Sequence, residues 1–87
     1  MWYVSIVRCV DDTLYIGETN DVDSRLVKHN EGGGSVFIAK RRPVVEVYRE
    51  EHLTRNAALR RERQVKRWTR AKKEALIAGD IDVLRRL

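Results

Sequence analysis

Two β-like runs separated by one short turn constrain this chain more than any other feature. Residues Trp2–Val10 are almost all aromatic or β-branched, which favours a strand. Asp11 and Asp12 form a turn signal, and Thr13–Ile16 is again β-like. These runs predict an antiparallel hairpin. Alternate side chains of its first strand should face opposite sides of a sheet.

A helical pattern and a third strand follow the hairpin. The helix is expected from about Asp21 to Asn30, and three consecutive glycines, Gly32–Gly34, predict its end. Residues Ser35–Arg42 show no clear pattern. Pro43 predicts the start of a strand over Val44–Tyr48, since proline is tolerated at the first position of a strand.

Helices are expected from there to the end of the chain. Thr54 is suited to cap a helix that extends to about Arg67, and Thr69 or a neighbour to start another that Gly79 ends. A short last helix is expected over 80–87. The order β-β-α-β-α-α predicts a single α/β (α+β) domain over residues 1–87, with a core of about 1–79 and a small sheet flanked by helices.

The positive charge of the chain is concentrated in one block. The sequence has 18 basic and 13 acidic residues, yet residues 40–73 alone carry thirteen basic and four acidic groups, a net charge of +9. A block of this kind points to a polyanion, and nucleic acid is the common one. A solvated, arginine-rich helix surface is the alternative, although few acids are interleaved to neutralise it.

Cysteine usage and hydropathy indicate a cytoplasmic protein. Cys9 is the one cysteine and lies between apolar residues, so a buried, reduced thiol is expected. No run is long and apolar enough to span a membrane, and the strand-like first residues lack the features of a signal peptide.

Chemically capable side chains cluster just after the turn of the hairpin. Tyr15 ends the second β-like run, and Gly17 lets the backbone turn or be approached closely. Arg25 and His29 are four residues apart and share one face of the predicted helix. The alternative is an ordinary strand tyrosine beside two solvated helix residues.

Glu62 lies on an apolar helix face. Ala58, Val65 and Trp68 share that face at helical spacing, so Glu62 points toward the core or a cleft. Because burying an unpartnered carboxylate is costly, it either pairs with a buried arginine such as Arg25 or binds a divalent cation.

Taken in order and at their intervals, these residues resemble the GIY-YIG nuclease superfamily, especially its small single-domain bacterial members of the YhbQ-like, UPF0213 type. The likeness runs from residue 2 to about residue 79 and includes Tyr15–Gly17, Arg25, His29 and Glu62. It implies a three-stranded antiparallel sheet flanked by helices. It also implies hydrolysis of a DNA phosphodiester with one divalent cation, Mg²⁺ or Mn²⁺.

The resemblance also implies roles for individual residues. Tyr15 would contact, orient or activate the attacking water, and Arg25 would hold the scissile phosphate, a task that suits its planar donor fork. Glu62 would bind the metal ion. His29 would act as a base or as a phosphate ligand, and Gly17 would serve a structural turn.

Two positions depart from the pattern of the family. Ser5 stands where the first motif tyrosine is expected, and as a catalytic candidate its hydroxyl would position water. Tyr3 lies two residues earlier on the same strand face and is the candidate to assist Tyr15 as a phenol. Glu18 follows the motif glycine, where some members have a lysine, so it would repel phosphate or help to hold a metal ion.

The basic block supplies the candidates for contacts with the nucleic-acid backbone, which are Lys40, Arg41, Arg42, Lys66, Arg67 and Arg70. Trp68 either stacks on a base or belongs to the core. The sequence thus predicts a monomeric, structure-selective or weakly specific DNA endonuclease of repair or recombination. One alternative is a nucleic-acid-binding module on the same fold with weak or lost catalysis, and another is a domain that binds an acidic protein.

Overall fold

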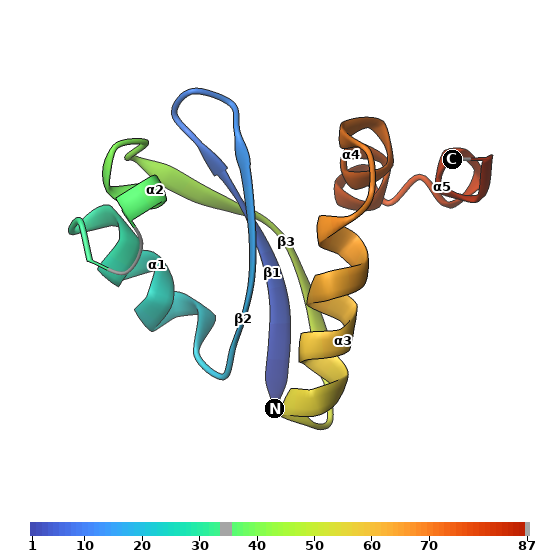
Figure 1. Ribbon diagram of the computed structural model, residues 1–87, viewed down its shortest axis with the longest axis horizontal. Helices are drawn as coiled ribbons and strands as arrows, with labels where there is room; N and C mark the ends of the chain where they lie inside the picture. Colours follow the sequence, from blue (N-terminus) through green and yellow to red (C-terminus); the bar gives the residue numbers. More distant parts are fainter. Residues whose placement is uncertain (34–35, 87) are drawn as a thin grey trace.

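A computed structural model describes residues 1–33 and 36–86 of the chain. The elements in this part follow one another in the order β1 (Trp2–Cys9), β2 (Leu14–Thr19), α1 (Val22–Asn30), α2 (Val36–Ala39), β3 (Val44–His52), α3 (Arg55–Lys66), α4 (Arg70–Ala78) and α5 (Ile81–Arg86). The predicted order is confirmed, with the short helix α2 added to it. Figure 1 shows the sheet between α1 and α2 on one side and α3 and α4 on the other.

The three strands form one antiparallel sheet in the order β2-β1-β3. β1 is therefore the central strand and β2 lies at an edge, where it pairs with β1 alone in the described part of the chain. The register sets Ser5 opposite Gly17 and Val7 opposite Tyr15, which confirms the predicted hairpin.

Two apolar clusters, one on each face of the sheet, hold the helices to it. Val4 and Ile6 of β1 are fully buried and belong to a cluster with Ala58 and Val65 of α3. On the other face, Val7 and Cys9 cluster with Ile38 of α2 and Val44 of β3. The predicted alternation of β1 and the buried, reduced thiol of Cys9 are both confirmed.

Capping side chains fix the ends of the helices where the sequence indicates them. Asp21, Thr54 and Thr69 each accept a hydrogen bond from the backbone N–H three residues later. Gly79 adopts a left-handed conformation with φ of 70° and ends α4. Each such N-cap typically stabilises a helix by about 1 kcal/mol.

The predicted turn at Gly17 is wrong, because β2 continues through Gly17 as far as Thr19. Its backbone keeps the register of the hairpin opposite Ser5. Because Gly17 has no side chain, another group can approach its backbone closely, which is the second of the two roles expected for this glycine.

Two further boundaries differ from the sequence-based expectation. β3 extends to His52 instead of ending at Tyr48, because its charged continuation has partners: Glu50 accepts hydrogen bonds from Tyr48 and Arg61. Helix α2 lies in a segment without clear pattern and is stabilised by one fully buried side chain, Ile38. Gly34, Ser35 and Leu87, which the predicted loop and last helix include, lie outside the described residues.

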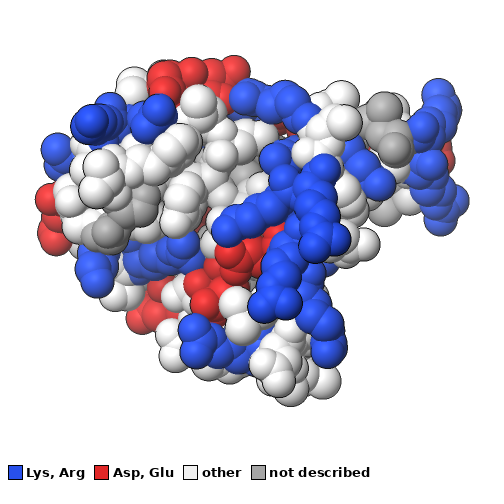
Figure 2. Space-filling model, viewed as in Figure 1, with Lys and Arg blue, Asp and Glu red and all other residues white. Residues whose placement is uncertain are grey.

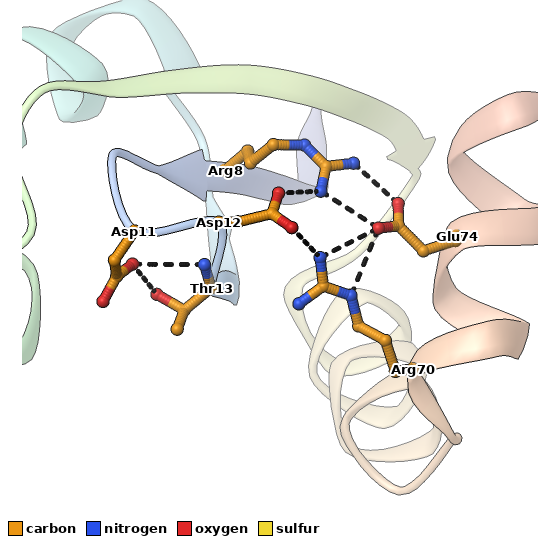
Figure 3. A network of polar contacts seen from close by, with 6 residues as sticks. All are labelled: Arg8, Asp11, Asp12, Thr13, Arg70 and Glu74. Carbon is orange, nitrogen blue, oxygen red and sulfur yellow. Dashed lines mark hydrogen bonds and ion pairs between the residues drawn. The ribbon is translucent and has the colours of Figure 1, made fainter.

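A network of ion pairs ties the hairpin to α4 (Figure 3). Arg8 of β1 donates to both carboxylate oxygens of Glu74, at 2.6 and 3.0 Å, and to Asp12 at 2.8 Å. Arg70 donates to Asp12 and Glu74 from the other side, at 3.1 and 3.0 Å. The two arginines hold the pKa of Glu74 down at about 2.

We expect Glu74→Gln to lower the free energy of unfolding by about 1 kcal/mol near neutral pH, the upper end for exposed ion pairs. A carboxyl whose pKa is lowered on folding stabilises the fold above its unfolded pKa, near 4.5, and this stabilisation disappears as the pH falls toward 2. The two proteins should therefore converge in acid, as measured by urea denaturation across this pH range.

Glu51→Gln is the matched control, because Glu51 is exposed and its side chain has no ion pair in the described part of the chain. It should change stability little at any pH. A deficit of Glu74→Gln that stays constant with pH would show that the charge of Glu74 does not stabilise the fold.

Candidate functional site

Tyr15, Arg25 and His29 meet on the face of the sheet that α1 covers. β2 presents Tyr15, and α1 presents the other two side chains one turn apart. The imidazole of His29 meets the phenol ring of Tyr15 edge-on, with ring centroids 5.7 Å apart. The guanidinium carbon of Arg25 lies 5.6 Å from the centroid of the same phenol ring. The convergence expected from the sequence is present in the fold.

Gly17 makes room for Arg25. A Cβ atom at this position would overlap the guanidinium, so no residue with a side chain fits under Arg25 where it lies. Arg25 Nη1 donates a hydrogen bond of 2.7 Å to the carbonyl oxygen of Glu18. Since a guanidinium has five N–H donors and no other partner of this one is found in the described residues, most of its donors are available to a ligand.

Ser5 lies beside this arrangement, and Tyr3 lies further away. Ser5 is 4% exposed and stands opposite Gly17 in the register of the hairpin. Tyr3 stands opposite Thr19, and the guanidinium of Arg49 lies 5.6 Å from its ring centroid. Tyr3 and Tyr15 are therefore separated by the Ser5–Gly17 pair and do not form a pair of phenols.

The imidazole of His29 is buried and electrically neutral near neutral pH. It is 4% exposed, and its Nδ1 has no hydrogen-bond partner in the described part of the chain. Burial lowers the pKa of this imidazole, and the positive charges of Arg25 and Lys28 lower it further. A neutral imidazole has a nitrogen that can accept a hydrogen bond or a proton.

Phe37 is a member of this cluster that the sequence did not reveal. The ring of Phe37 stacks against Tyr15 with centroids 5.9 Å apart, and the guanidinium carbon of Arg41 lies 3.9 Å from the centroid of the Phe37 ring. Phe37 belongs to α2, a helix of four residues that is too short for a periodic pattern. The apolar run Val36–Ala39 was the one available signal.

Glu62 lies on α3, on the other side of the sheet from α1 and its Arg25 and His29. Its side chain is 15% exposed and forms an ion pair of 2.7 Å with Lys66 Nζ, one turn along the helix. The alternative pairing with Arg25 is not found among the described residues, because Arg25 bonds to the backbone of Glu18 instead.

A second carboxylate, that of Glu18, lies under the start of α3. Its Oε1 is 3.3 Å from Arg55 Nη2, and its Oε2 is buried without a hydrogen-bond partner. Glu18 belongs to the edge strand β2, whose carbonyl Arg25 contacts from the α1 side. Figure 2 shows acidic side chains in the middle of this face, between basic ones.

The carboxylate of Glu62 fits a divalent cation that would take one ligand from the protein and others from a bound phosphate and water. No group of three or more possible metal ligands is found in residues 1–33 and 36–86. Mg²⁺ commonly uses one or two carboxylates together with water and substrate phosphates, and the shielded carboxylate of Glu62 matches that mode. Lys66, which now neutralises Glu62, would have to move aside.

Most of the predicted backbone-contacting residues have partners within the chain: Arg41, Arg42, Lys66 and Arg70. Arg41 Nε donates to Asp11 at 3.0 Å, and Arg42 donates to two backbone carbonyl oxygens. Lys40 and Arg67 are exposed and have no side-chain partner in the described part of the chain. Trp68 packs against the core, between Arg61 and Lys72.

A hollow of about 410 Å³ lies apart from these residues. It is lined by Asn30, Ala39, Lys40, Arg42 and Pro43, near the ends of α1 and α2. Tyr15, Arg25, His29 and Glu62 do not line it, and the contacts of the first three place them at β2 instead. None of the helices in the described residues is long and apolar enough to cross a bilayer.

Comparison with known proteins relates most of the chain to one family. Residues 1–75 match the family described as the GIY-YIG catalytic domain. A UPF0213 protein of Staphylococcus epidermidis is 44% identical over 75 residues, which cover 86% of this chain and 92% of the relative. A UPF0213 protein of Staphylococcus aureus is 47% identical over the same shares of the two chains.

A solved structure agrees with these sequence comparisons. The solution NMR structure of a UPF0213 protein from Bacillus halodurans has a TM-score of 0.59 and 37% sequence identity to this chain. The match covers 92% of this chain and 86% of that protein. The fold expected from the resemblance is thus confirmed, sheet and flanking helices included.

Substituting Gly17 with alanine should displace Arg25 with little loss of stability. The overlapping atoms belong to the end of a flexible side chain, so we expect the free energy of unfolding to change by less than about 1 kcal/mol. The hydrogen bond to the Glu18 carbonyl should break, which the NMR signals of the Arg25 guanidinium would report.

Gly79→Ala is the matched control. A Cβ at Gly79 meets nothing within 4 Å, but its φ of 70° disfavours alanine, so this variant should lose about 1 kcal/mol and leave the Arg25 signals unchanged. If Gly17→Ala also left those signals unchanged, the close contact between Arg25 and the backbone would be disproved.

Proposed function

The chain belongs to the GIY-YIG family, and we propose on this basis that it is a metal-dependent endonuclease that hydrolyses phosphodiester bonds in DNA. Membership of the family makes it a relative of nucleases, whereas the substrate, the metal ion and the roles of the residues are part of the proposal. The observation that carries it is the guanidinium of Arg25, fixed against Gly17 beside Tyr15 and not neutralised by a carboxylate.

Arg25 is proposed to bind the scissile phosphate. Its one hydrogen bond inside the chain, to the Glu18 carbonyl, holds the guanidinium in place without cancelling its charge. Two of the remaining donors can bind two phosphate oxygens at once. Because the negative charge on these oxygens is redistributed in the transition state, a fixed cation there lowers the barrier without having to reorganise.

Tyr15 and His29 are proposed to position the attacking water. The ring of Tyr15 contacts both the guanidinium of Arg25 and the imidazole of His29. The lowered pKa of His29 keeps the imidazole neutral near neutral pH, which is the form that can take a proton from water. Its burial favours transfer through the Tyr15 hydroxyl over direct contact with the substrate.

Glu62 is proposed to hold the divalent cation, Mg²⁺ or Mn²⁺. When bound, such an ion polarises phosphoryl oxygens and stabilises the leaving oxygen. The contribution of the chain is a carboxylate that is shielded from solvent beside Lys66. Glu18, with one buried and unpartnered oxygen, adds negative potential on the same side.

The substrate is proposed to be DNA that is recognised by structure more than by sequence, as in repair or recombination. The described residues form one small domain of a three-stranded sheet and flanking helices. Contacts made through arginine and lysine to phosphates position a protein but do not specify a sequence. A cytoplasmic site of action fits the free, buried thiol of Cys9.

A second candidate function is nucleic-acid binding with weak or lost catalysis. The observation that favours it is Ser5, which is buried opposite Gly17 where the family pattern has a tyrosine. A hydroxymethyl group can hold a water molecule but cannot act as a phenol does. Under this alternative, the chain binds DNA in a salt-dependent manner without needing a metal ion.

The nuclease proposal predicts that Arg25→Ala and Glu62→Gln each reduce cleavage of plasmid and branched DNA by about 100-fold or more, the usual effect of removing one group that stabilises transition-state charge. Initial rates with Mg²⁺ and with Mn²⁺ measure this. Arg85→Ala and Glu51→Gln, two exposed positions away from the site, should cleave like the unmodified protein. Cleavage that persists in both site variants would rule out the assignment.

A variant with Ser5→Tyr separates the two candidate functions. If the chain is an active nuclease with Tyr15 as its phenol, this change should raise cleavage by less than about tenfold. It should also cost about 1–3 kcal/mol of stability, because the position is buried. A rise of about 100-fold or more, the size of a gained proton-transfer group, would instead favour lost catalysis.

A further inference from the structure

The outer side of α3 carries an unpartnered row of arginines. Arg60, Arg63 and Arg67 follow one another at intervals of three and four residues, so they lie along one face of the helix. All three are exposed, and none has a hydrogen bond or an ion pair from its side chain within residues 1–33 and 36–86. These three residues are named here the outer arginine stripe.

Two other arginines of the same helix form ion pairs with glutamates of the sheet. Arg55 pairs with Glu18, and Arg61 pairs with Glu50 and lies 5.0 Å from the ring of Trp68. The helix buries Ala58 and Val65 against the sheet, and the outer arginine stripe lies on the opposite face. Arg55 and Arg61 thus have acidic partners, whereas the outer arginine stripe has none in the described part of the chain.

Helix stability alone does not account for the outer arginine stripe. Basic residues in a last turn interact favourably with the helix dipole, which covers Arg63 and Arg67 at the C-terminal end. Arg60 lies in the middle of the helix, where this benefit is absent. Like charges one turn apart destabilise a helix by a few tenths of a kcal/mol per pair, so the row costs stability that an anionic ligand would restore.

The dimensions of the outer arginine stripe suit one strand of a nucleic acid. Seven residues of helix separate its ends, which corresponds to about 10 Å at 1.5 Å per residue. Phosphates recur every 3.4 Å or so along the axis for each strand of DNA, so the row spans about three of them. The basic ridge over α3 borders the acidic group beside β2 in Figure 2.

The geometry points to the outer arginine stripe as the surface that binds the phosphates of one DNA strand next to the site at β2. Arg63 and Glu62 are neighbours in the sequence but point about 100° apart around α3, so the stripe would hold the strand on the outer side of the helix that carries Glu62. Arg41 and Arg70 keep their internal ion pairs in this arrangement. This inference rests on the proposed function, since it assigns the substrate contacts of the same enzyme.

The test compares a stripe variant, Arg60→Gln/Arg63→Gln/Arg67→Gln, with a control variant, Lys73→Gln/Arg85→Gln/Arg86→Gln. Both lose three positive charges, and the control residues lie on α4 and α5 without ion pairs in the described part of the chain. Binding to a 30-base-pair duplex DNA is measured by fluorescence anisotropy in EDTA, which prevents cleavage, over a range of salt concentrations. Circular dichroism and thermal unfolding confirm that both variants fold.

The stripe variant should reduce the slope of log affinity against log salt by about 2.7, which is 0.9 for each lost phosphate contact. The control should keep the slope of the unmodified protein within about 1. Equal losses in both variants would overturn the inference in favour of general charge attraction, and an unchanged slope in the stripe variant would overturn it outright. If a duplex RNA of the same sequence bound more tightly than the DNA, the assignment of DNA as ligand would be overturned.

The failure of this inference can be told apart from the failure of the proposed function. If the unmodified protein binds and cleaves DNA while the stripe variant binds equally well, only the stripe is disproved. If the unmodified protein binds no DNA even at low salt, both the stripe and the nuclease assignment fail together.

Discussion

The burial of β1 on both faces is the constraint on which the rest of the structure depends. Val4 and Ile6 need an apolar cover on one side, and Val7 and Cys9 need one on the other. α3 and α4 supply the first cover and α2 supplies part of the second. Since β1 occupies the centre of the sheet, β2 must lie at an edge, where residues from both faces can approach the same strand.

The candidate site follows from this arrangement of layers. Tyr15 and Glu18 point to opposite faces of β2, one toward His29 of α1 and the other toward Arg55 of α3. Arg25 lies against Gly17 and donates a hydrogen bond to the backbone carbonyl of Glu18, the residue whose side chain points to the α3 side. A glycine within an edge strand thus lets one guanidinium approach the backbone closely, beside the ring of Tyr15 and bonded to the carbonyl of Glu18.

Local chemistry in the sequence was sufficient to predict most of the elements, and the exceptions have physical causes. Alternation placed Val4 and Val7 on their faces, and capping side chains marked Thr54 and Thr69. The turn expected at Gly17 failed because glycine signals either a bend or a close contact, and only the position of Arg25 in space decides between them. Helix α2 escaped prediction because a four-residue helix is held by one buried side chain, Ile38, and not by periodicity.

The basic block indicates an anionic ligand but does not show which of its side chains lack partners within the protein. Lys40, Arg41 and Arg70 look alike in the basic block. In the fold, however, Arg41 forms an ion pair with Asp11, and Arg70 forms ion pairs with Asp12 and Glu74. The two aspartates belong to the hairpin turn, 30 and 58 residues away from these arginines, so only the fold reveals those two pairings, whereas Glu74 lies one turn along α4 from Arg70. The criterion that we propose for a phosphate-binding arginine is the lack of such an acid, and it selects Arg25 and the outer arginine stripe of α3. Arg25 belongs to α1 and the outer arginine stripe to α3, two helices that pack on opposite sides of the sheet.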